Sequence, residues 1–175
     1  FYVGPSNFHT FELINKWPKW EKNFLNISGE KYSGKSHLIN IFLKKFKGIK
    51  LEAKLLNDEN LKLVKPHQNI ILEDLDLNIN EKVIYSLFNI IDQENKFLIV
   101  TSAKPIAELN FQLDDLSSRT KNCLIAMIDK PDDDLMFALI LKNLSDRQIA
   151  LDKKLIDFII KRIERSYSKI FEFIY

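Results

Sequence analysis

The sequence is poor in the residues that build disulfides, zinc sites and membrane spans. Its one cysteine, Cys123, lies in an apolar stretch, which indicates a reducing compartment and a small core residue rather than a disulfide or a nucleophile. One cysteine and three dispersed histidines argue against a zinc site. No apolar run approaches the roughly 20 residues that span a bilayer, and no signal peptide is visible. We therefore expect a cytoplasmic protein with no membrane partner.

Arginine is also scarce. Only four of the 26 basic residues are arginines, namely Arg119, Arg147, Arg162 and Arg165. Where lysine is the default cation, an arginine can mark a need for a planar, forked donor; the alternative is a surface arginine paired with an acid. The net charge of +2 by itself requires neither nucleic acid nor a membrane as partner. The 175 residues, 46% of them hydrophobic, suffice for one globular domain with a small appendage.

The stretch over residues 27–36 is the one around which the chain is arranged. It reads Ile-Ser-Gly-Glu-Lys-Tyr-Ser-Gly-Lys-Ser and stands between an apolar run and a helical pattern, as a phosphate loop requires. The two glycines let successive backbone amides converge on one point, the lysine would reach the β- and γ-phosphates, and the final serine would hold Mg²⁺. The alternative is an ordinary turn between a strand and a helix. The predicted phosphate-binding residues are Gly29, Glu30, Lys31, Tyr32, Ser33, Gly34, Lys35, Ser36 and His37.

Acidic and hydroxyl groups follow two further apolar strands. An apolar run over residues 70–72 delivers Glu73 and Asp74, where phosphate-loop enzymes place groups that hold Mg²⁺ and polarise water. The alternative is a pair of solvated acids, and Asp76 is expected to cap a helix. Thr101 and Ser102 follow the strand over residues 96–100 and either sense a γ-phosphate or cap a turn.

The order of the elements predicts an α/β fold. Strands are expected over residues 23–28, 49–53, 70–72, 96–100 and 123–128, with helices over 8–17, 35–46, 81–92 and 114–119. Such alternation is typical of a parallel sheet with helices on both faces. Beyond Pro131, helical patterns over 132–145, 152–165 and 166–175 follow without strands. We therefore expect an α/β domain over 1–130 and a partial helical domain over 131–175, with Trp17 and Trp20 as core anchors.

Eight short motifs together resemble one protein family. They are Phe-Tyr-Val-Gly-Pro-Ser-Asn at 1–7, Trp-Pro-Lys-Trp at 17–20, Gly-Lys-Ser-His-Leu at 34–38, Glu-Asp-Leu-Asp at 73–76, Leu-Ser-Ser-Arg at 116–119, Pro-Asp-Asp at 131–133, Ser-Asp-Arg-Gln at 145–148 and Arg-Ile-Glu-Arg-Ser at 162–166. The chain resembles the AAA+ ATPases of the bacterial replication-initiator DnaA group, and within it the Hda-type (HdaA) regulators. The resemblance implies an AAA+ P-loop NTPase fold with a five-stranded parallel sheet and a truncated helical lid.

The resemblance also implies a role for each candidate residue. Lys35 and Ser36 would be Walker A residues, and Glu73 and Asp74 would be Walker B residues. Val3, Gly4 and Asn7 would lie near the adenine, and Thr101 or Ser102 would be the first sensor. Arg119 would be the arginine finger offered to a neighbouring subunit, and Arg165 would be the second sensor in the lid. A surface pairing of Arg119 with Asp114 or Asp115 is the alternative for that residue. Glu73 stands where the initiator group usually has Asp, which implies weak self-hydrolysis. Residues are expected to precede Phe1, where the family's clamp-binding motif would lie.

Three functions share these features. The first is a regulatory adaptor that binds ADP or ATP with Mg²⁺, associates with the DNA polymerase III sliding clamp (β), and promotes hydrolysis of ATP on DnaA to limit replication initiation. Such an adaptor would contact DNA only indirectly or weakly, could form a homodimer or oligomer, and would be found near the nucleoid or replisome. The second is a DNA-acting AAA+ ATPase, either initiator-like or a helicase loader. The third, a small-molecule kinase, is disfavoured by the AAA+-like positions of Arg119 and Arg165.

Overall fold

The computed structural model describes residues 1–76 and 78–175. A five-stranded sheet is built from the strands β1 (Phe24–Gly29), β2 (Ile49–Glu52), β3 (Asn69–Leu75), β4 (Phe97–Ser102) and β5 (Leu124–Ile128). The α-helices are α1 (Phe8–Asn15), α2 (Lys35–Lys45), α3 (Asp58–Val64), α4 (Glu81–Gln93), α5 (Asp114–Lys121), α6 (Asp133–Asp146), α7 (Lys153–Ile160) and α8 (Tyr167–Ile174). Short 3₁₀ turns, η1 (Ala53–Leu55) and η2 (Ile106–Glu108), follow β2 and β4.

The sheet is parallel and has the strand order β2-β3-β4-β1-β5. This confirms the predicted five-stranded parallel sheet. Because all strands run in one direction, the carboxyl ends of β3, β4 and β1 lie side by side at one edge. That edge therefore collects the residues that follow three separate apolar runs, which is where parallel α/β sheets bind their ligands.

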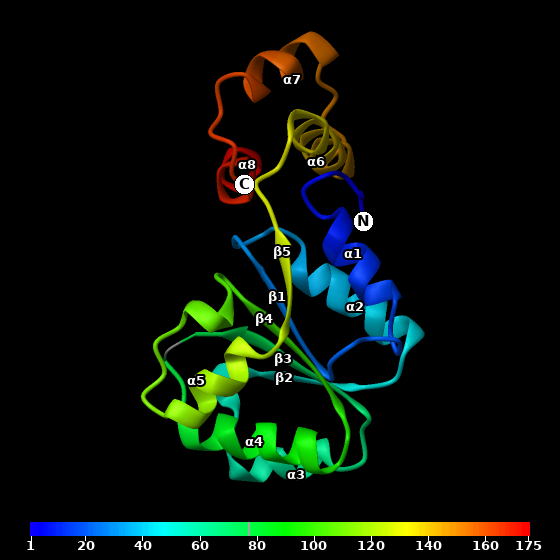
Figure 1. Ribbon diagram of the computed structural model, residues 1–175. Helices are drawn as coiled ribbons and strands as arrows, with labels where there is room; N and C mark the ends of the chain where they lie inside the picture. Colours follow the sequence, from blue (N-terminus) through cyan, green and yellow to red (C-terminus); the bar gives the residue numbers. More distant parts are fainter. Residues whose placement is uncertain (77) are drawn as a thin grey trace.

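Alternation along each strand divides the core between the two faces of the sheet. In β3, Ile70 and Leu72 pack with α3, α4 and α5, whereas Ile71 packs with α1 and α2 on the other face. Trp17 and Trp20 join the second layer through edge contacts with Phe97, at centroid distances of 5.6 and 5.9 Å. This confirms their expected role as core anchors, and both layers are visible around the sheet in Figure 1.

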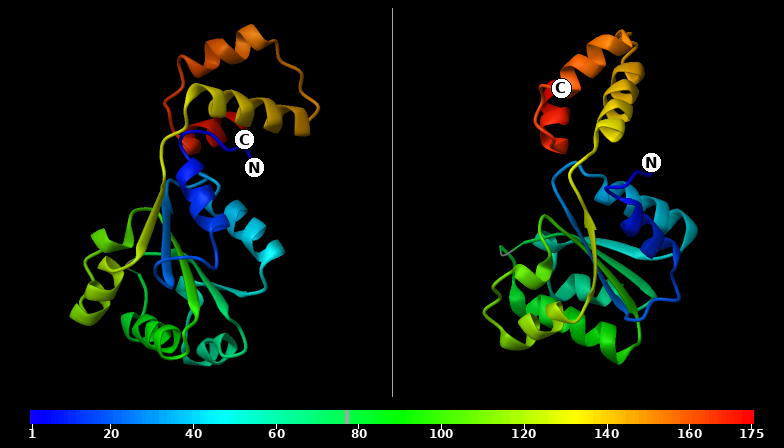
Figure 2. Two further views of the ribbon diagram at one scale, coloured as in Figure 1. Left: turned by 45° about the vertical axis from the view of Figure 1, so that its right-hand side comes forward. Right: turned by 45° about the horizontal axis from the view of Figure 1, so that its top comes forward.

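The helices α6, α7 and α8 stand apart from the sheet and form a layer of their own. β5 leads directly into them, and they lie beyond the carboxyl edge of the sheet in all views (Figure 1 and Figure 2). Their apolar sides form a separate small core that includes Met136, Ile156 and Ile170. No helix in the described part of the chain is both long and apolar enough to traverse a bilayer.

Several element boundaries differ from the sequence-based expectations. The first helix ends at Asn15, two residues before Trp17, because a residue that precedes proline disfavours helical backbone. The strand β4 extends through Thr101 and Ser102, so both are strand residues. The helix α7 ends at Ile160 rather than 165, and a turn leads to α8.

Two further differences concern helix starts. The helix α3 was missed, although Asn57 caps it by accepting from the backbone N–H groups of Glu59 and Asn60 at 3.0 Å each. Asp76 does not cap a helix: its carboxylate accepts from the backbone N–H of Asn78 and pairs with Lys54 at 3.6 Å. The next helix, α4, is capped by Asn80 instead. Several polar residues stand between the end of β3 and the start of α4, so the sequence does not distinguish which of them caps α4.

A buried asparagine ties the carboxyl ends of β1 and β4 together. Asn26 is fully buried, and its side-chain NH₂ donates to the Val100 carbonyl at 3.2 Å and to Ser102 Oγ at 2.9 Å. Its side-chain oxygen accepts from the Ile106 backbone N–H at 3.0 Å. The strand ends that carry the candidate site are therefore joined by a polar network as well as by the sheet.

Removing this network should lower the stability of the fold. Asn26→Ala leaves buried polar groups without partners, so we expect the free energy of unfolding to fall by about 2–4 kcal/mol. The exposed Asn15 donates only to the Phe11 carbonyl within its own helix, so Asn15→Ala should change stability by no more than about 0.5 kcal/mol. Urea denaturation of both variants measures the difference, and equal midpoints would contradict the structural role of Asn26.

Candidate functional site

The loop between β1 and α2 is shaped by two residues with left-handed backbone. Gly34 has φ +95° and immediately precedes α2, and Tyr32 has φ +67°. Gly29 ends β1 in a tight place, where an added Cβ would lie 2.9 Å from Ser33 Oγ and 3.2 Å from the Ile128 carbonyl oxygen. The loop therefore wraps closely around the N-terminus of α2, the end of a helix that attracts anions.

Lys35 folds back over this loop. Its Nζ donates to the carbonyl oxygens of Gly29 at 2.7 Å and Glu30 at 2.9 Å, and the residue is only 9% exposed. Burial lowers the pKa of Lys35, while the negative charges of Asp74 and Glu30 act in the opposite direction. A buried ammonium group at this position can move a short distance from carbonyl oxygens to phosphate oxygens. Ser36, the next residue, is exposed at the start of α2.

Among the described residues, several buried polar atoms around the loop lack a hydrogen-bond partner. They include Ser28 Oγ, Ser33 Oγ and Glu73 Oε1. Buried polar atoms in native proteins nearly always have partners, so these positions suit a polar ligand. No group of three or more His, Cys, Asp or Glu side chains gathers in the described part of the chain. Mg²⁺ that comes with a nucleotide needs only one or two protein groups besides the phosphates, so the residues present fit it.

The two acidic candidates at the end of β3 lie in different surroundings. Glu73 is 7% exposed and pairs with Lys50 of β2 at 3.0 Å. Asp74 has φ +56° and is exposed. Of the two negative charges that act to raise the pKa of Lys35, that of the Asp74 carboxylate has the larger effect. The sequence predicts that one of the two holds Mg²⁺ and the other polarises water, without deciding between them. In the structure, Asp74 alone of the two acts on the lysine of the loop.

The two hydroxyl candidates at the end of β4 also separate. Thr101 is fully buried, and its Oγ1 accepts from the Asp74 backbone N–H at 3.0 Å, which links the ends of β3 and β4. Ser102 Oγ accepts from the Asn26 side chain and donates to the Lys104 carbonyl at 2.6 Å. Ser102 therefore belongs to the hydrogen-bond network around Asn26, while Thr101 contacts the backbone of Asp74.

The two arginine candidates are both paired within the chain. Arg119 Nη1 lies 2.8 Å from Asp92 Oδ2, and its guanidinium lies 5.2 Å from the Tyr85 ring centre. The alternative partners Asp114 and Asp115 are thus wrong. Arg165 Nη2 lies 2.8 Å from Asp133 Oδ1, and its side chain is 62% exposed.

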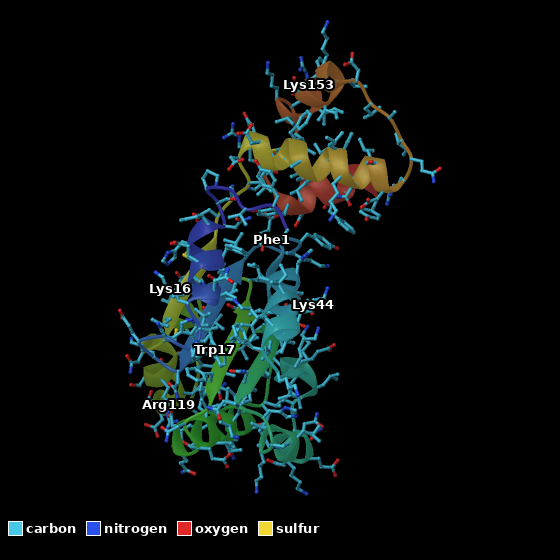
Figure 3. All side chains as sticks on the ribbon, turned by 90° about the vertical axis from the view of Figure 1, so that its right-hand side faces the viewer. Phe1, Lys16, Trp17, Lys44, Arg119 and Lys153 are labelled. Carbon is cyan, nitrogen blue, oxygen red and sulfur yellow. The ribbon has the colours of Figure 1, made fainter. Side chains whose placement is uncertain are left out.

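Arg119 is far from the loop of its own chain. It lines a small cavity of about 80 Å³ together with Asn23 and Phe24, at the amino end of β1, whereas the loop follows the carboxyl end of that strand. The five steps of about 3.3 Å between the six residues of β1 separate its two ends by roughly 17 Å. Figure 3 likewise shows Arg119 in the lower part of the molecule, with Phe1 above it at mid-height and the lid (the helices α6–α8, with Lys153) at the far end.

A cavity of about 220 Å³ lies between the loop, the N-terminal segment and the helix α6. Asn7 lines this cavity, and its side-chain oxygen accepts a hydrogen bond from the Gly4 backbone N–H at 3.0 Å. Val3 and Gly4, which were also expected near the adenine, do not line the cavity. The lining also includes Tyr32, Gly34, His37, Leu139 and Tyr167. Apolar and aromatic walls with one buried amide suit a flat heterocyclic base.

Some residues around the site were not singled out in the sequence. Asn26, Lys50, Asp92, and the Ser166–Ser168 segment at the start of α8 all contact candidate residues. An asparagine inside an apolar strand and a serine before a helical pattern were the available signals for Asn26 and Ser166. The ion-pair partners could not be found without the tertiary fold.

Comparison with known proteins shows which proteins the chain is similar to in sequence. No family model matches the chain. It is 25% identical, over an alignment of 189 positions, to the chromosomal replication initiator protein DnaA of Borreliella afzelii (strain PKo), and 24% identical to that of Borrelia garinii subsp. bavariensis. Both alignments cover 93% of this chain. The chain is thus related in sequence to these two DnaA proteins.

This DnaA-related chain spans only 39% of the length of those two relatives. Among solved structures, a DnaA bound to AMPPCP and single-stranded DNA matches with a TM-score of 0.79 at 20% identity, over 99% of this chain and 61% of that one. Domain III of DnaA from Thermotoga maritima matches with a TM-score of 0.76 at 20% identity, over 97% of this chain and 82% of that one. A Thermotoga maritima RuvB mutant matches with a TM-score of 0.74 at 12% identity, over 99% of this chain and 62% of that one. These structural likenesses establish the AAA+ fold.

Proposed function

We propose that the chain is a DnaA-related adaptor that binds ADP or ATP with Mg²⁺ and promotes hydrolysis of ATP bound to DnaA. In this proposal it works with the sliding clamp in the bacterial cytoplasm, near the nucleoid or replisome, and thereby limits replication initiation. DNA is contacted indirectly or weakly. The support comes from the DnaA relatives, from the shape of the loop over residues 29–37, and from the position of Arg119.

The nucleotide would be held by residues that the fold already brings together. The loop amides and Lys35 would bind the phosphates, Ser36 and Asp74 would hold Mg²⁺ with Glu73 behind them, and the cavity beside Asn7 would take the adenine. Bound Mg²⁺ supplies positive charge that neutralises the phosphate oxygens. Thr101, whose Oγ1 accepts from the Asp74 backbone N–H, would act as the first sensor. A second-sensor role for Arg165 requires its guanidinium to leave Asp133.

The observation that carries the adaptor mechanism is the separation of the loop and Arg119 at opposite ends of β1. A guanidinium beside the amino end of a strand roughly 17 Å long cannot touch a nucleotide bound at the carboxyl end of the same strand. It can reach the nucleotide of a neighbouring subunit when two AAA+ domains pack head to tail, with the amino end of one sheet against the loop of the next. An arginine at that place neutralises charge that develops on the transferred phosphoryl group.

A first experiment asks which nucleotide the purified chain carries and what it does to DnaA. Mass spectrometry of released small molecules should detect an adenine nucleotide, with ADP expected for an adaptor that does not turn over. Adding the chain and clamp-loaded DNA to ATP-bound DnaA should then speed conversion of that ATP to ADP. Absence of any adenine nucleotide, together with no binding of added ADP or ATP, would contradict the proposal.

A second candidate function is a DNA-acting AAA+ ATPase, either initiator-like or a helicase loader. The contact between Thr101 and the Asp74 backbone favours it, because this pair would serve hydrolysis of the chain's own ATP. It predicts intrinsic hydrolysis that depends on Asp74, is stimulated by single-stranded DNA and weakens as salt rises. The adaptor predicts little intrinsic turnover and no stimulation by DNA alone.

A further inference from the structure

The phosphate loop is hydrogen-bonded to the lid through the carboxylate of Glu30. This carboxylate accepts hydrogen bonds from Ser166 Oγ, from the Tyr167 backbone N–H at 3.1 Å and from the Ser168 backbone N–H at 3.2 Å. The first N–H groups of a helix have no partners within it, so a carboxylate at this end both caps α8 and meets its positive dipole. Glu30 thus caps a helix that lies more than 130 residues away in the sequence.

The ionisation of Glu30 reflects this contact. Burial acts to raise the pKa of its carboxyl group, but the hydrogen bonds from Ser166, Ser168 and Tyr167 outweigh burial and bring the pKa below its ordinary value of 4.5. A group with a lowered pKa stabilises the folded state at pH values above its ordinary pKa, and that stabilisation is lost as the pH falls through the lowered value. At neutral pH the carboxylate is therefore charged and the contact with α8 is complete.

A second side chain of the same loop also reaches α8. The Tyr32 ring stacks on the Phe171 ring at a centroid distance of 3.9 Å and an angle of 5°, and Phe171 stacks in turn on Tyr175 at 4.2 Å. Tyr32 holds a positive φ of 67°, a conformation that glycine adopts freely and that a bulky residue resists. The loop therefore carries a tyrosine at a backbone position that favours glycine, and its ring packs against the lid.

Lys35 connects these contacts to the proposed phosphate site. Its ammonium group donates to the carbonyl oxygen of Glu30, the residue whose carboxylate caps α8. A polyphosphate in the loop would draw Lys35 toward itself and bring negative charge near the Glu30 carboxylate. Both effects would act on the cap of α8. Arg165, the lid arginine, is directed at Asp133 instead.

We propose that Glu30 and Tyr32 fasten helix α8 directly to the phosphate loop and pass a change in the occupancy of that loop to the lid. They are positioning residues: they hold the lid over the cavity beside Asn7 without themselves being reacting groups. The fastening does not depend on the adaptor function. Only the transmission of occupancy rests on the proposed nucleotide binding.

Hydrogen exchange of the full chain, first without added nucleotide, tests the fastening. Glu30→Gln removes the charge from three hydrogen bonds, so the α8 amides should exchange about tenfold faster or more, while amides of β1 and β4 stay protected as in the wild type. Tyr32→Ala should also speed α8 exchange. Tyr32→Gly should do the same while making the rest of the fold more stable than Tyr32→Ala does, because glycine accepts the positive φ.

The matched control is Glu172→Gln, the same chemical change on α8 itself, where the carboxylate pairs only with the exposed Lys169 at 2.7 Å. It should leave α8 exchange near the wild-type rate. Wild-type α8 protection in both Glu30→Gln and Tyr32→Ala would overturn the fastening.

Saturating Mg-ADP or Mg-ATP, with binding verified by mass spectrometry, tests the transmission. Bound nucleotide should change α8 exchange in the wild type by about threefold or more and have little effect on α8 in Glu30→Gln. An unchanged wild-type α8 with nucleotide bound would overturn the transmission. Failure of nucleotide to bind would instead contradict the proposed function, and the fastening would still be judged by the measurement without nucleotide.

Discussion

Replacing Arg119 by alanine is expected to reduce the stimulated turnover of DnaA-bound ATP by about 10³-fold or more, within the range of 10³–10⁵ typical of arginine fingers. The same variant should bind its own nucleotide with unchanged affinity, because Arg119 lies at the amino end of β1 and the loop at its carboxyl end. Single-turnover conversion of ATP to ADP on DnaA, with clamp-loaded DNA, measures the first effect. Nucleotide titration of the variant measures the second.

Two companion variants separate a finger from a surface arginine. Arg162→Ala removes an arginine that contacts Phe158 within the lid, at 3.5 Å from the ring centre and 3.4 Å from the carbonyl oxygen, and should leave the stimulation unchanged. Asp92→Asn removes the ion-pair partner that holds Arg119 in its own chain. A partly exposed pair is worth at most about 1 kcal/mol, so its loss should leave stimulation intact or raise it up to about fivefold. Full stimulation by Arg119→Ala would remove the trans mechanism.

Much of the fold follows from patterns that are local in the sequence. The apolar runs of the five strands and the helical periods between them imply a parallel sheet, and the glycine spacing identifies the loop after β1. The missed helix α3 shows where local reading fails: its seven residues give only two turns, and their cap at Asn57 resembles an ordinary polar loop. The early end of α7 at Ile160 is similar, because the residues after it, Lys-Arg-Ile-Glu-Arg at 161–165, all have side chains that a helix accommodates well, and no glycine or proline marks the end.

The candidate site was less predictable because its decisive contacts join distant parts of the chain. No local pattern distinguishes Thr101 from Ser102, and the difference arises only when Asn26 of β1 takes Ser102 as a partner. The contact between Glu30 and the start of α8 likewise requires the lid to be placed over the loop. The positive φ of Tyr32 also becomes visible only in the folded loop, because nothing in the neighbouring sequence indicates it.

Replacing Lys35 by alanine is expected to weaken the binding of ADP and ATP by about 100-fold, which corresponds to roughly 2.7 kcal/mol. The reason is the loss of a buried ammonium group that would form charge-assisted hydrogen bonds to phosphate oxygens in a water-poor loop. Fluorescent-nucleotide titration or calorimetry measures the affinity, and circular dichroism with thermal melting checks that the sheet still folds.

Lys31 offers a matched control within the same loop. Its ammonium group is exposed and lies 5.0 Å from the Tyr32 ring centre, so Lys31→Ala should lower the affinity by no more than about fivefold. A large loss for Lys35→Ala with a small loss for Lys31→Ala would locate the phosphates within reach of the Lys35 ammonium group, which now donates to the carbonyl oxygens of Gly29 and Glu30. Equal affinities for wild type and Lys35→Ala would mean that Lys35 does not bind the phosphates, and would contradict the proposed nucleotide site in this loop.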